Sequence, residues 1–416
     1  WHSPPSMQAW QGNIDLVRNF LENRPAYYRQ HLTDLFGKQD SALVSMQIVG
    51  QGKVLLSGVA FSQNMQGYFF KNADIVLQAV PAPGHRFVAW QGIGGAGENA
   101  GLTPTGDTAF TAIFTPVAGI SIIPPVISSD TTLSAAASPW YGFEDVTVLP
   151  GTRLIVEAGA TLLLSDGVCL DVQGGLYLDG SPEQRINIRP DLSPSARRSY
   201  YGQSGYWGSI MADAPTDSLV IRYTDLRGGS FGRDRNRHFS TVSTYDCPLR
   251  VEHSTISEGK APLIARGGNA YIGHSEFHTF VSCNGFVSLY DMDAPLVEHS
   301  VFRGNRAINT DGIDIKGVTN GVVRHNEVYG FLGSNCDGID LGIYTLNCLL
   351  EQNVIHDCSD KGISIGSQSS ALVRRNVVYD CDLGIALKDS LAVAHIDQNT
   401  FYGNRQAVAC YEKSAL

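Results

Sequence analysis

Apolar and polar positions recur in one short phrase from Thr224 onward. Each copy holds an aliphatic residue, two polar residues, a Ser, Thr or Asn, one further residue and then an apolar one. Successive copies lie 21 to 30 residues apart, which suits coils that bulge only at their loops. The spacing therefore predicts a parallel β-helix, in which each coil buries its aliphatic side chains against the next. The Ser, Thr and Asn anchors of the eight copies are Thr224, Ser254, Ser275, Ser300, Asn326, Asn353, Asn376 and Asn399.

A second phrase shares this period and supports the same fold. Gly312-Ile-Asp-Ile, Gly338-Ile-Asp-Leu, Gly362-Ile-Ser-Ile and Gly384-Ile-Ala-Leu follow one another after 26, 24 and 22 residues. In each copy two aliphatic residues flank one residue that points outward from a strand. Like residues of successive coils should therefore form columns with steps of about 4.8 Å.

Two columns are expected at a bend of each coil. The four Asn anchors, from Asn326 to Asn399, should form a ladder with positive φ, because Asn tolerates that conformation and its amide can bond from coil to coil. The residues directly before the anchors include His253, His274, His299 and His325, which should form the second column. Imidazole stacking explains that column, and a metal site is the alternative.

Upstream of the repeats the pattern changes. Apolar residues at helical spacing run from Ile14 to Leu21 and from Tyr28 to Phe36, and Arg24-Pro25 between them predicts two short helices. Residues 41–117 hold period-two runs broken by Gly and Pro, which predict a small β-domain. Residues 118–139, rich in Pro, Ser, Ala and Ile, are expected to be a linker. The expected domains are 1–38, helical; 39–117, the β-domain; 118–139, the linker; and 140–416, the β-helix.

The helical segment resembles a known family. Trp1-His-Ser-Pro-Pro-Ser, Asn13-Ile, Phe20-Leu-Glu-Asn-Arg-Pro25 and Gln30-His-Leu are similar to the end of spore-coat-H-like (CotH) kinase domains. That resemblance implies a kinase-like domain upstream of Trp1. The sequence is accordingly expected to be a fragment or a processed product. The chain has no Gly-rich phosphate loop and no catalytic-loop motif. Kinase activity is therefore not predicted for it.

The β-domain and the β-helix resemble modules of bacterial surface proteins. Gly52-Lys-Val, the run from Ala79 to Trp90 and Thr111-Ala-Ile-Phe114 are similar to internalin-type B-repeats, which are spacers and adhesion modules. Residues 148–176 resemble the first coils of secreted bacterial right-handed β-helix proteins of the pectate-lyase and polygalacturonase type. This second resemblance covers residues 140–415. The predicted fold class is mainly β: a right-handed parallel β-helix of about 10 coils, preceded by a small β-domain and a short N-terminal helical segment.

Composition narrows the choice of partners. The net charge of −10 repels a phosphate backbone, so nucleic acid is not an expected partner. No stretch of about 18 apolar residues could span a bilayer. Eight Cys at irregular spacing match no metal-binding motif and leave the disulfide pairing open.

The outward residues of the Gly-Ile phrases carry the candidate chemistry. Asp314 and Asp340 share one column with Ser364 and Ala386, and Asp311 and Asp337 precede them. Such carboxylates can raise one another's pKa and divide into an acid and a base, as glycosidic cleavage requires. They could equally bind Ca²⁺ through Asp311, Asp314, Asp337 and Asp340, and no other cofactor is expected. A third interpretation is ordinary turn chemistry with solvated carboxylates.

Asn309-Thr-Asp311 also resembles the Asn-Thr-Asp signature of polygalacturonases. Asp337 keeps one carboxylate of that family's Asp pair, Asp360-Lys361-Gly362 stands in place of its Gly-His-Gly, and Lys388 retains the lysine of its Arg-Ile-Lys. Half of that family's motif is missing, so its activity is not carried over. The candidate catalytic residues are Asp311, Asp337, Asp340, Lys361 and Lys388.

Further residues are expected to bind substrate. The loop with Arg235 and Arg237 combines cations with nearby aromatic rings, which suits an acidic sugar, although a solvated loop is the alternative. The candidate substrate-binding residues are Asp314, Lys316, Tyr290, Arg266, Arg235 and Arg237. The first hypothesis is a secreted or cell-surface β-helix that engages polysaccharide, an acidic glycan among the options, and that cleaves it if it is an enzyme. The second is a non-catalytic adhesion or spacer module of a CotH-like protein.

Overall fold

The computed structural model describes residues 6–37, 40–82, 84–95, 97–191, 205–279 and 281–412. The chain divides into two compact units, Trp1–Val117 and Ala118–Leu416, and each has its own hydrophobic core. The run Trp1-His-Ser-Pro-Pro, which carries part of the CotH resemblance, lies outside the described residues.

The first unit begins with a single helix, α1 (Met7–Phe36). Ser6 caps it by accepting a hydrogen bond from the Ala9 N–H at 3.2 Å, and Gly37 ends it with a φ of 65°. The prediction of two helices broken near Arg24-Pro25 is wrong, because Pro25 lies inside this one helix. A proline has a helical φ and removes only one hydrogen bond, so it can kink a long helix without ending it.

Eight strands form the rest of the first unit and confirm the expected β-domain. Their bounds are β1 (Ser41–Val49), β2 (Gly52–Leu56), β3 (Val59–Phe61), β4 (Met65–Phe70), β5 (Ile75–Pro81), β6 (His85–Gln91), β7 (Asn99–Leu102) and β8 (Thr108–Pro116). They make two four-stranded sheets with orders β4-β1-β8-β6 and β3-β2-β5-β7. Alternate residues such as Val44 and Met46 are buried, as the period-two pattern requires.

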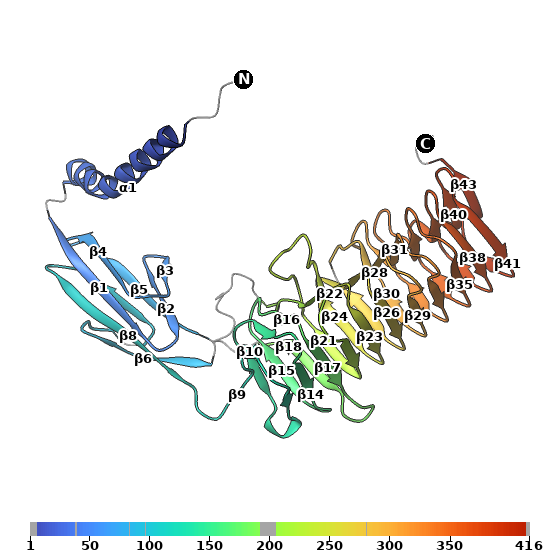
Figure 1. Ribbon diagram of the computed structural model, residues 1–416, viewed down its shortest axis with the longest axis horizontal. Helices are drawn as coiled ribbons and strands as arrows, with labels where there is room; N and C mark the ends of the chain where they lie inside the picture. The colour runs from blue at the N-terminus through green and yellow to red at the C-terminus, as the bar shows by residue number, and fades with distance from the viewer. Residues whose placement is uncertain are drawn as a thin grey trace. The chain divides into compact units, whose positions relative to one another are not determined.

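The second unit is a right-handed parallel β-solenoid of about eleven turns, which confirms the predicted fold class. Strands of successive coils lie side by side along the whole stack (Figure 1). They form three parallel sheets. The first sheet holds β10 (Val126–Ile127), β13 (Val146–Val148), β16 (Leu170–Val172), β19 (Ile210–Asp213), β22 (Ser240–Tyr245), β25 (Ala261–Arg266), β28 (Gly285–Tyr290), β31 (Asp311–Lys316), β34 (Ile339–Leu341), β37 (Lys361–Ile365), β40 (Leu383–Lys388) and β43 (Gln406–Tyr411).

The other two sheets follow the first within each coil. The second sheet holds β11 (Thr131–Leu133), β14 (Arg153–Val156), β17 (Gly175–Asp179), β20 (Leu219–Arg222), β23 (Pro248–Glu252), β26 (Asn269–Gly273), β29 (Leu296–Glu298), β32 (Val322–Arg324), β35 (Cys348–Glu351), β38 (Ser370–Arg374) and β41 (Val393–Asp397). The third sheet holds β9 (Ser121–Ile122), β12 (Trp140–Gly142), β15 (Thr161–Leu164), β18 (Ile186–Pro190), β21 (Thr224–Arg227), β24 (Thr255–Gly259), β27 (Glu276–Thr279), β30 (Val301–Arg303), β33 (Glu327–Tyr329), β36 (Val354–His356), β39 (Val377–Tyr379) and β42 (Thr400–Tyr402).

The solenoid begins inside the segment expected to be a linker. β9, β10 and β11 all lie between residues 118 and 139, together with a short 3-10 helix, Ala135–Ala137. Each of the three strands pairs with the next coil of its sheet. Pro, Ser and Ala make this coil resemble a linker in composition, yet buried Ile127 and Leu133 join the solenoid core.

The anchor column is present at the corner between the second and third sheets. The Asn326 N–H donates to Asn353 Oδ1 at 3.1 Å, and the Asn353 N–H donates to Asn376 Oδ1 at 2.9 Å. Asn376 repeats the contact with Asn399, also at 2.9 Å. The expected ladder is thus confirmed, and Ser and Thr continue it upstream in the same way.

The positive φ, however, belongs to the residue before each anchor. His253, His274, His299 and His325 have φ values of 50° to 55°, and none of the four Asn anchors has a positive φ. The four imidazoles stack at centroid distances of 4.7 to 4.8 Å with nearly parallel planes. The ladder Asn instead needs extended backbone, because its side chain must reach inward to the neighbouring coil. The His column is therefore a ring stack on the solenoid surface.

Candidate functional site

Three strands of the first sheet bring the predicted carboxylates together. The register aligns Asp314 of β31 with Asp340 of β34, and Asp340 with Ser364 of β37. Ser364 in turn faces Ala386 of β40, so the predicted outward column is confirmed. Asp311 and Asp337 lie at the beginnings of two successive coils, where the Asp337 N–H donates to Asp311 Oδ1 at 2.8 Å.

These side chains line a polar cleft of about 230 Å³ on the outer wall of the solenoid. Carboxylates, amides and lysines make almost the whole lining. We define the polar cleft by Asn284, Asn309, Asp311, Asp314, Lys316, Asn335, Asp337, Asp340 and Lys388. The three asparagines among them come from turns that precede the strands, so the cleft lies where the third sheet leads into the first.

Three of the four carboxylates are buried, so the expectation that they stay solvated is wrong for Asp314, Asp337 and Asp340. The Asp314 side chain is 0% exposed, that of Asp337 is 7% exposed and that of Asp340 is 11% exposed. Turn residues and long lysine side chains cover this column although it faces away from the core. Burying a carboxylate is costly unless it is paired or protonated, so the partners of each one decide its chemistry.

The pKa values of Asp311 and Asp337 are raised to different extents. Burial raises the pKa of Asp311, and the neighbouring charges of Asp337 and Asp340 raise it further, to about 9. Burial also raises the pKa of Asp337, but Lys361 counteracts this and leaves it at about 6. Between these two values Asp311 keeps its proton while Asp337 is ionised. The pair therefore presents one proton donor and one proton acceptor at neutral pH.

Two lysines pair with Asp337 and Asp340. Lys361 Nζ lies 3.3 Å from Asp337 Oδ1 and also bonds Asp360. Lys388 Nζ lies 3.0 Å from Asp340 Oδ1 and 3.9 Å from Asp337 Oδ2. Burial opposes the charge of each lysine, yet the adjacent carboxylates raise the pKa of both above the ordinary value. The lysines consequently stay charged and fix the base of the cleft.

Asp314 has one oxygen without a protein partner. Tyr290 Oη donates to Asp314 Oδ2 at 2.5 Å, and Lys316 Nζ lies 2.8 Å from the same oxygen. Asp314 Oδ1 is buried and forms no hydrogen bond. Burial also raises the pKa of this carboxyl. Because an unpaired buried acceptor costs about 1–3 kcal/mol, Asp314 Oδ1 is prepared for a donor, such as a hydroxyl group, that enters the cleft.

The predicted arginines lie outside the polar cleft. Arg266 Nε pairs with Asp291 at 3.0 Å, and its guanidinium lies 5.6 Å from the centre of the Tyr290 ring. Arg237 Nε pairs with Asp213 at 2.9 Å. Arg235 instead lines a separate hollow of about 530 Å³, which we call the aromatic hollow. Its lining is Phe231, Arg235, Asn236, Phe239, Lys260, Ala261, Val281, Ser282, Cys283 and Asn284.

The expected Ca²⁺ ligands do not converge. Within the described ranges, no group of three or more His, Cys, Asp or Glu has the geometry to hold a metal ion. Lys361 and Lys388 occupy the positions beside Asp337 and Asp340 where a cation would bind. The stacked histidines face one another in parallel and cannot direct their nitrogens at one point.

The cleft residues that the repeat analysis missed are Asn284 and Asn335. They lie in turns whose lengths differ from coil to coil, so the strand period does not mark them. Asn335 has a φ of 57°, and its Nδ2 donates to Asn309 Oδ1 at 2.9 Å. Asn309 and Asn335 are 26 residues apart, as are Asp311 and Asp337. This shared spacing is the sequence signal that could have identified Asn335 as a cleft residue.

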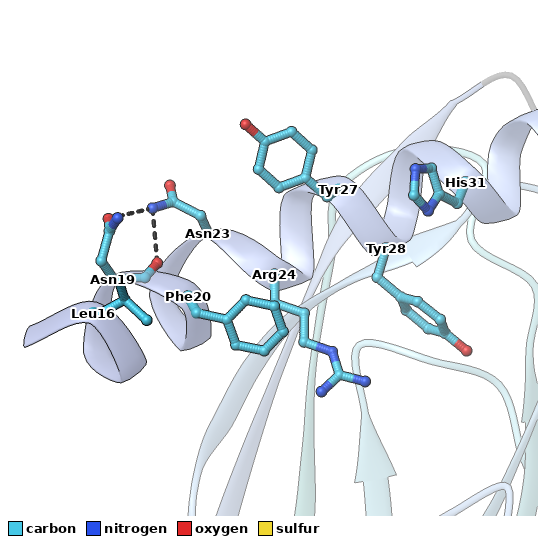
Figure 2. Close-up of a pocket in the computed structure, with 8 residues that line it drawn as sticks. All are labelled: Leu16, Asn19, Phe20, Asn23, Arg24, Tyr27, Tyr28 and His31. Atoms are coloured by element: carbon cyan, nitrogen blue, oxygen red, sulfur yellow. Dashed lines mark hydrogen bonds between the residues drawn. The ribbon is translucent and has the colours of Figure 1, made fainter. Parts of the chain in front are cut away.

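A further surface feature is an exposed group of largely apolar side chains on α1. Leu16, Phe20 and Tyr28 are exposed there, and the Arg24 guanidinium lies 5.5 Å from the centre of the Phe20 ring. Figure 2 shows this group of side chains, all from the one helix, with Asn23 bonded to Asn19. No second element of the described chain closes over them, so they form an open face.

Residues 263–416, which include the whole polar cleft, match the family model described as "Right handed beta helix region". The matched segment carries all four Gly-Ile phrases and the six copies of the first phrase anchored from Ser275 to Asn399. Neither the CotH resemblance nor the B-repeat resemblance gains support from this match. No described helix is long and apolar enough to cross a membrane.

Individual proteins are similar over parts of the chain. The protein bark beetle of Drosophila melanogaster is 25% identical over 150 residues, which are 35% of this chain and 4% of the length of that protein. Among solved structures, the periplasmic alginate epimerase AlgG is 11% identical, with 67% of this chain and 76% of that chain covered and a TM-score of 0.41. The Azotobacter vinelandii mannuronan C-5 epimerase AlgE4 A-module is 14% identical, with 70% and 89% covered and a TM-score of 0.31.

Proposed function

We propose that the polar cleft binds a polysaccharide and cleaves a glycosidic bond in it. The observation that carries the proposal is the pair of carboxyls, Asp311 and Asp337, which line one cleft from successive coils and have raised pKa values of about 9 and about 6. Hydroxyl-rich ligands match the lining of amides and carboxylates, and the unpaired Asp314 Oδ1 accepts from one sugar hydroxyl. Lys316 and Lys388 are already paired with Asp314 and Asp340, so the polar cleft alone does not select the charge of the glycan.

The reaction consumes one water molecule. Asp311 donates its proton to the oxygen of the leaving sugar as the bond to the anomeric carbon breaks. Asp337 takes a proton from the water whose oxygen forms the new bond to that carbon. A proton returning from Asp337 to Asp311 through solvent restores the starting state. Lys361 and Lys388 are positioning residues that keep Asp337 ionised.

Cleavage is tested by incubating the full chain with uronic-acid and neutral glycans and measuring new reducing ends. Asp311→Asn and Asp337→Asn should each lower the rate at least about 100-fold. Asp397→Asn, which changes an exposed carboxylate in the second sheet, is the control and should leave the rate unchanged. Wild-type rates in both cleft variants would contradict the assignment.

The pH profile provides an independent check. Asp337 must be ionised, so the rate should rise as the pH passes about 6, and Asp311 must be protonated, so the rate should fall above about 9. A rate that rises steadily to pH 10 would show that Asp311 is not the acid.

A second candidate function is a non-catalytic surface module that only binds glycan. The lysine pairs that neutralise Asp337 and Asp340 favour this alternative, because they would also suit a static binding wall. In this candidate the B-repeat-like first unit and the CotH-like helix place the solenoid at a bacterial surface or in secreted form, attached to a kinase-like domain. Glycan binding without any new reducing ends would select it over the enzyme.

A further inference from the structure

We infer that the aromatic hollow is a subsite for a sugar unit that carries an anionic group, and that one glycan chain occupies both this hollow and the polar cleft. The inference rests on the proposed function and adds to it the position and charge of a second sugar unit. The two depressions share Asn284 as a common wall. The volume of about 530 Å³ lies within the range typical of small-ligand sites, about 300–1,000 Å³.

Two cations in the hollow have no carboxylate partner. Along the 233–237 loop, Arg233 pairs with Asp145 and Arg237 pairs with Asp213. Arg235 and Lys260 form no ion pair within the described part of the chain, and no Asp or Glu lines the hollow. Most arginines of the solenoid are paired with carboxylates, so two unpaired cations at one depression are a local surplus of positive charge. An anionic group of a ligand would pair with these two cations and neutralise the surplus charge.

Aromatic rings support these cations without neutralising them. The Arg235 guanidinium lies 5.7 Å from the centre of the Phe231 ring, and Lys260 Nζ lies 4.6 Å from the centre of the Tyr206 ring. Cation–π contacts of this kind hold the side chains in place while their N–H groups stay free to donate. Phe231 and Phe239 are both half-buried in the hollow, where each offers apolar surface to the C–H face of a sugar ring.

The register places the hollow one or two coils before the reactive pair. Ala261, at the start of β25, lines the hollow, and Asn284 directly precedes β28. Gly285 of β28 is aligned with Asp311 of β31. Successive coils advance by about 4.8 Å. A glycan lying along the solenoid axis therefore passes from the cationic hollow to the Asp311–Asp337 pair, with its anionic unit on the side of β25.

Carboxylate and sulfate groups share the chemistry that Arg235 and Lys260 recognise. Binding is measured by calorimetry with the full chain carrying Asp311→Asn, which should slow cleavage of the probes at least about 100-fold. The probes are an oligogalacturonate, its methyl ester and a carrageenan oligosaccharide of equal length, which carries sulfate groups and no carboxylate. The Asp311→Asn chain should bind at least one charged probe at least tenfold more tightly than the methyl ester. The charged probe that binds more tightly identifies the group.

Arg235→Gln and Lys260→Gln are then added together to the chain that carries Asp311→Asn. This double variant should weaken binding of the preferred charged probe at least tenfold. It should also reduce the dependence of that binding on salt and leave the methyl ester unaffected. Arg303→Gln is the control, because it removes an exposed arginine from the third sheet, and it should change neither affinity. Equal thermal unfolding of all variants excludes misfolding as the cause.

The subsite and the proposed cleavage fail in different ways. Equal affinity of the double variant and its parent for every charged probe would overturn the subsite, and so would the absence of any charged preference. Neither result concerns the proton pair. Absence of any reducing-end release by the unaltered chain would overturn cleavage and leave the anionic preference standing.

Discussion

At the scale of single residues, Asp311 is the group whose burial has the clearest cost. Its carboxyl has a pKa of about 9 in the folded chain, whereas an Asp in an unfolded chain has a pKa of about 3.9. A pKa that is raised on folding contributes stability that is complete below about pH 3.9 and is lost as the pH rises toward 9. The chain therefore loses stability through the neutral range at this one side chain.

Asp311→Asn should remove that loss. The Asn side chain keeps an oxygen for the Asp337 N–H and does not titrate. The free energy of unfolding should increase by at least about 1.4 kcal/mol more at pH 8 than at pH 5, since one unit of pKa is worth that amount. Urea unfolding of the solenoid at both pH values measures this difference in the free energy of unfolding, with Asp397→Asn as the control. An equal change at both pH values would contradict the raised pKa.

At the scale of elements, the corner between the second and third sheets depends on the anchor ladder. Asn353 is fully buried, and its Nδ2 donates to Val323 O at 2.9 Å and to Asn376 Oδ1 at 3.0 Å. Its Oδ1 accepts from both the N–H and the Nδ2 of Asn326. One side chain thus satisfies polar groups of the coils on both sides.

Asn353→Ala should lower the free energy of unfolding by about 2–4 kcal/mol, because it leaves several buried donors and acceptors unpaired. Asn269→Ala, at an exposed position of β26, should change it by less than about 0.5 kcal/mol. Chemical denaturation of both variants makes the comparison. A loss below 1 kcal/mol for Asn353→Ala would mean that water replaces the amide.

The strand period made these elements predictable from the chain. Residues one coil apart fall into columns, so Asp314 above Asp340 and Asn353 above Asn376 followed from spacing alone. The burial of the outward carboxylates did not follow, because the cover comes from turns of irregular length, such as the one with Asn335. The continuous α1 was missed because the effect of Pro25 depends on whether the helix can tolerate a kink.

At the scale of the whole molecule, two separate cores stabilise the chain. Leu77 belongs to the core of the first unit and Ile339 to the core of the solenoid, and the two clusters share no residue. Independent cores unfold in separate transitions when few contacts couple them. The stability of the solenoid should therefore not depend on the β-domain.

Calorimetry of the full chain should show two transitions. Leu77→Ala should lower the midpoint of one transition and Ile339→Ala that of the other, each through a loss of about 2–5 kcal/mol. If either variant moved both midpoints equally, the units would unfold as one. Because both side chains are fully buried, each variant serves as the matched control for the other.

The in-register stacking of the first sheet also has a consequence for engineering. The strands of each rung pair only with strands of the rungs directly before and after it. Copying the segment between two equivalent glycines, such as Gly312 and Gly338, would insert one whole rung and extend the outer wall by about 4.8 Å without altering the inward aliphatic pattern. The outer wall could therefore be lengthened by whole coils, and its outward side chains could be substituted one coil at a time.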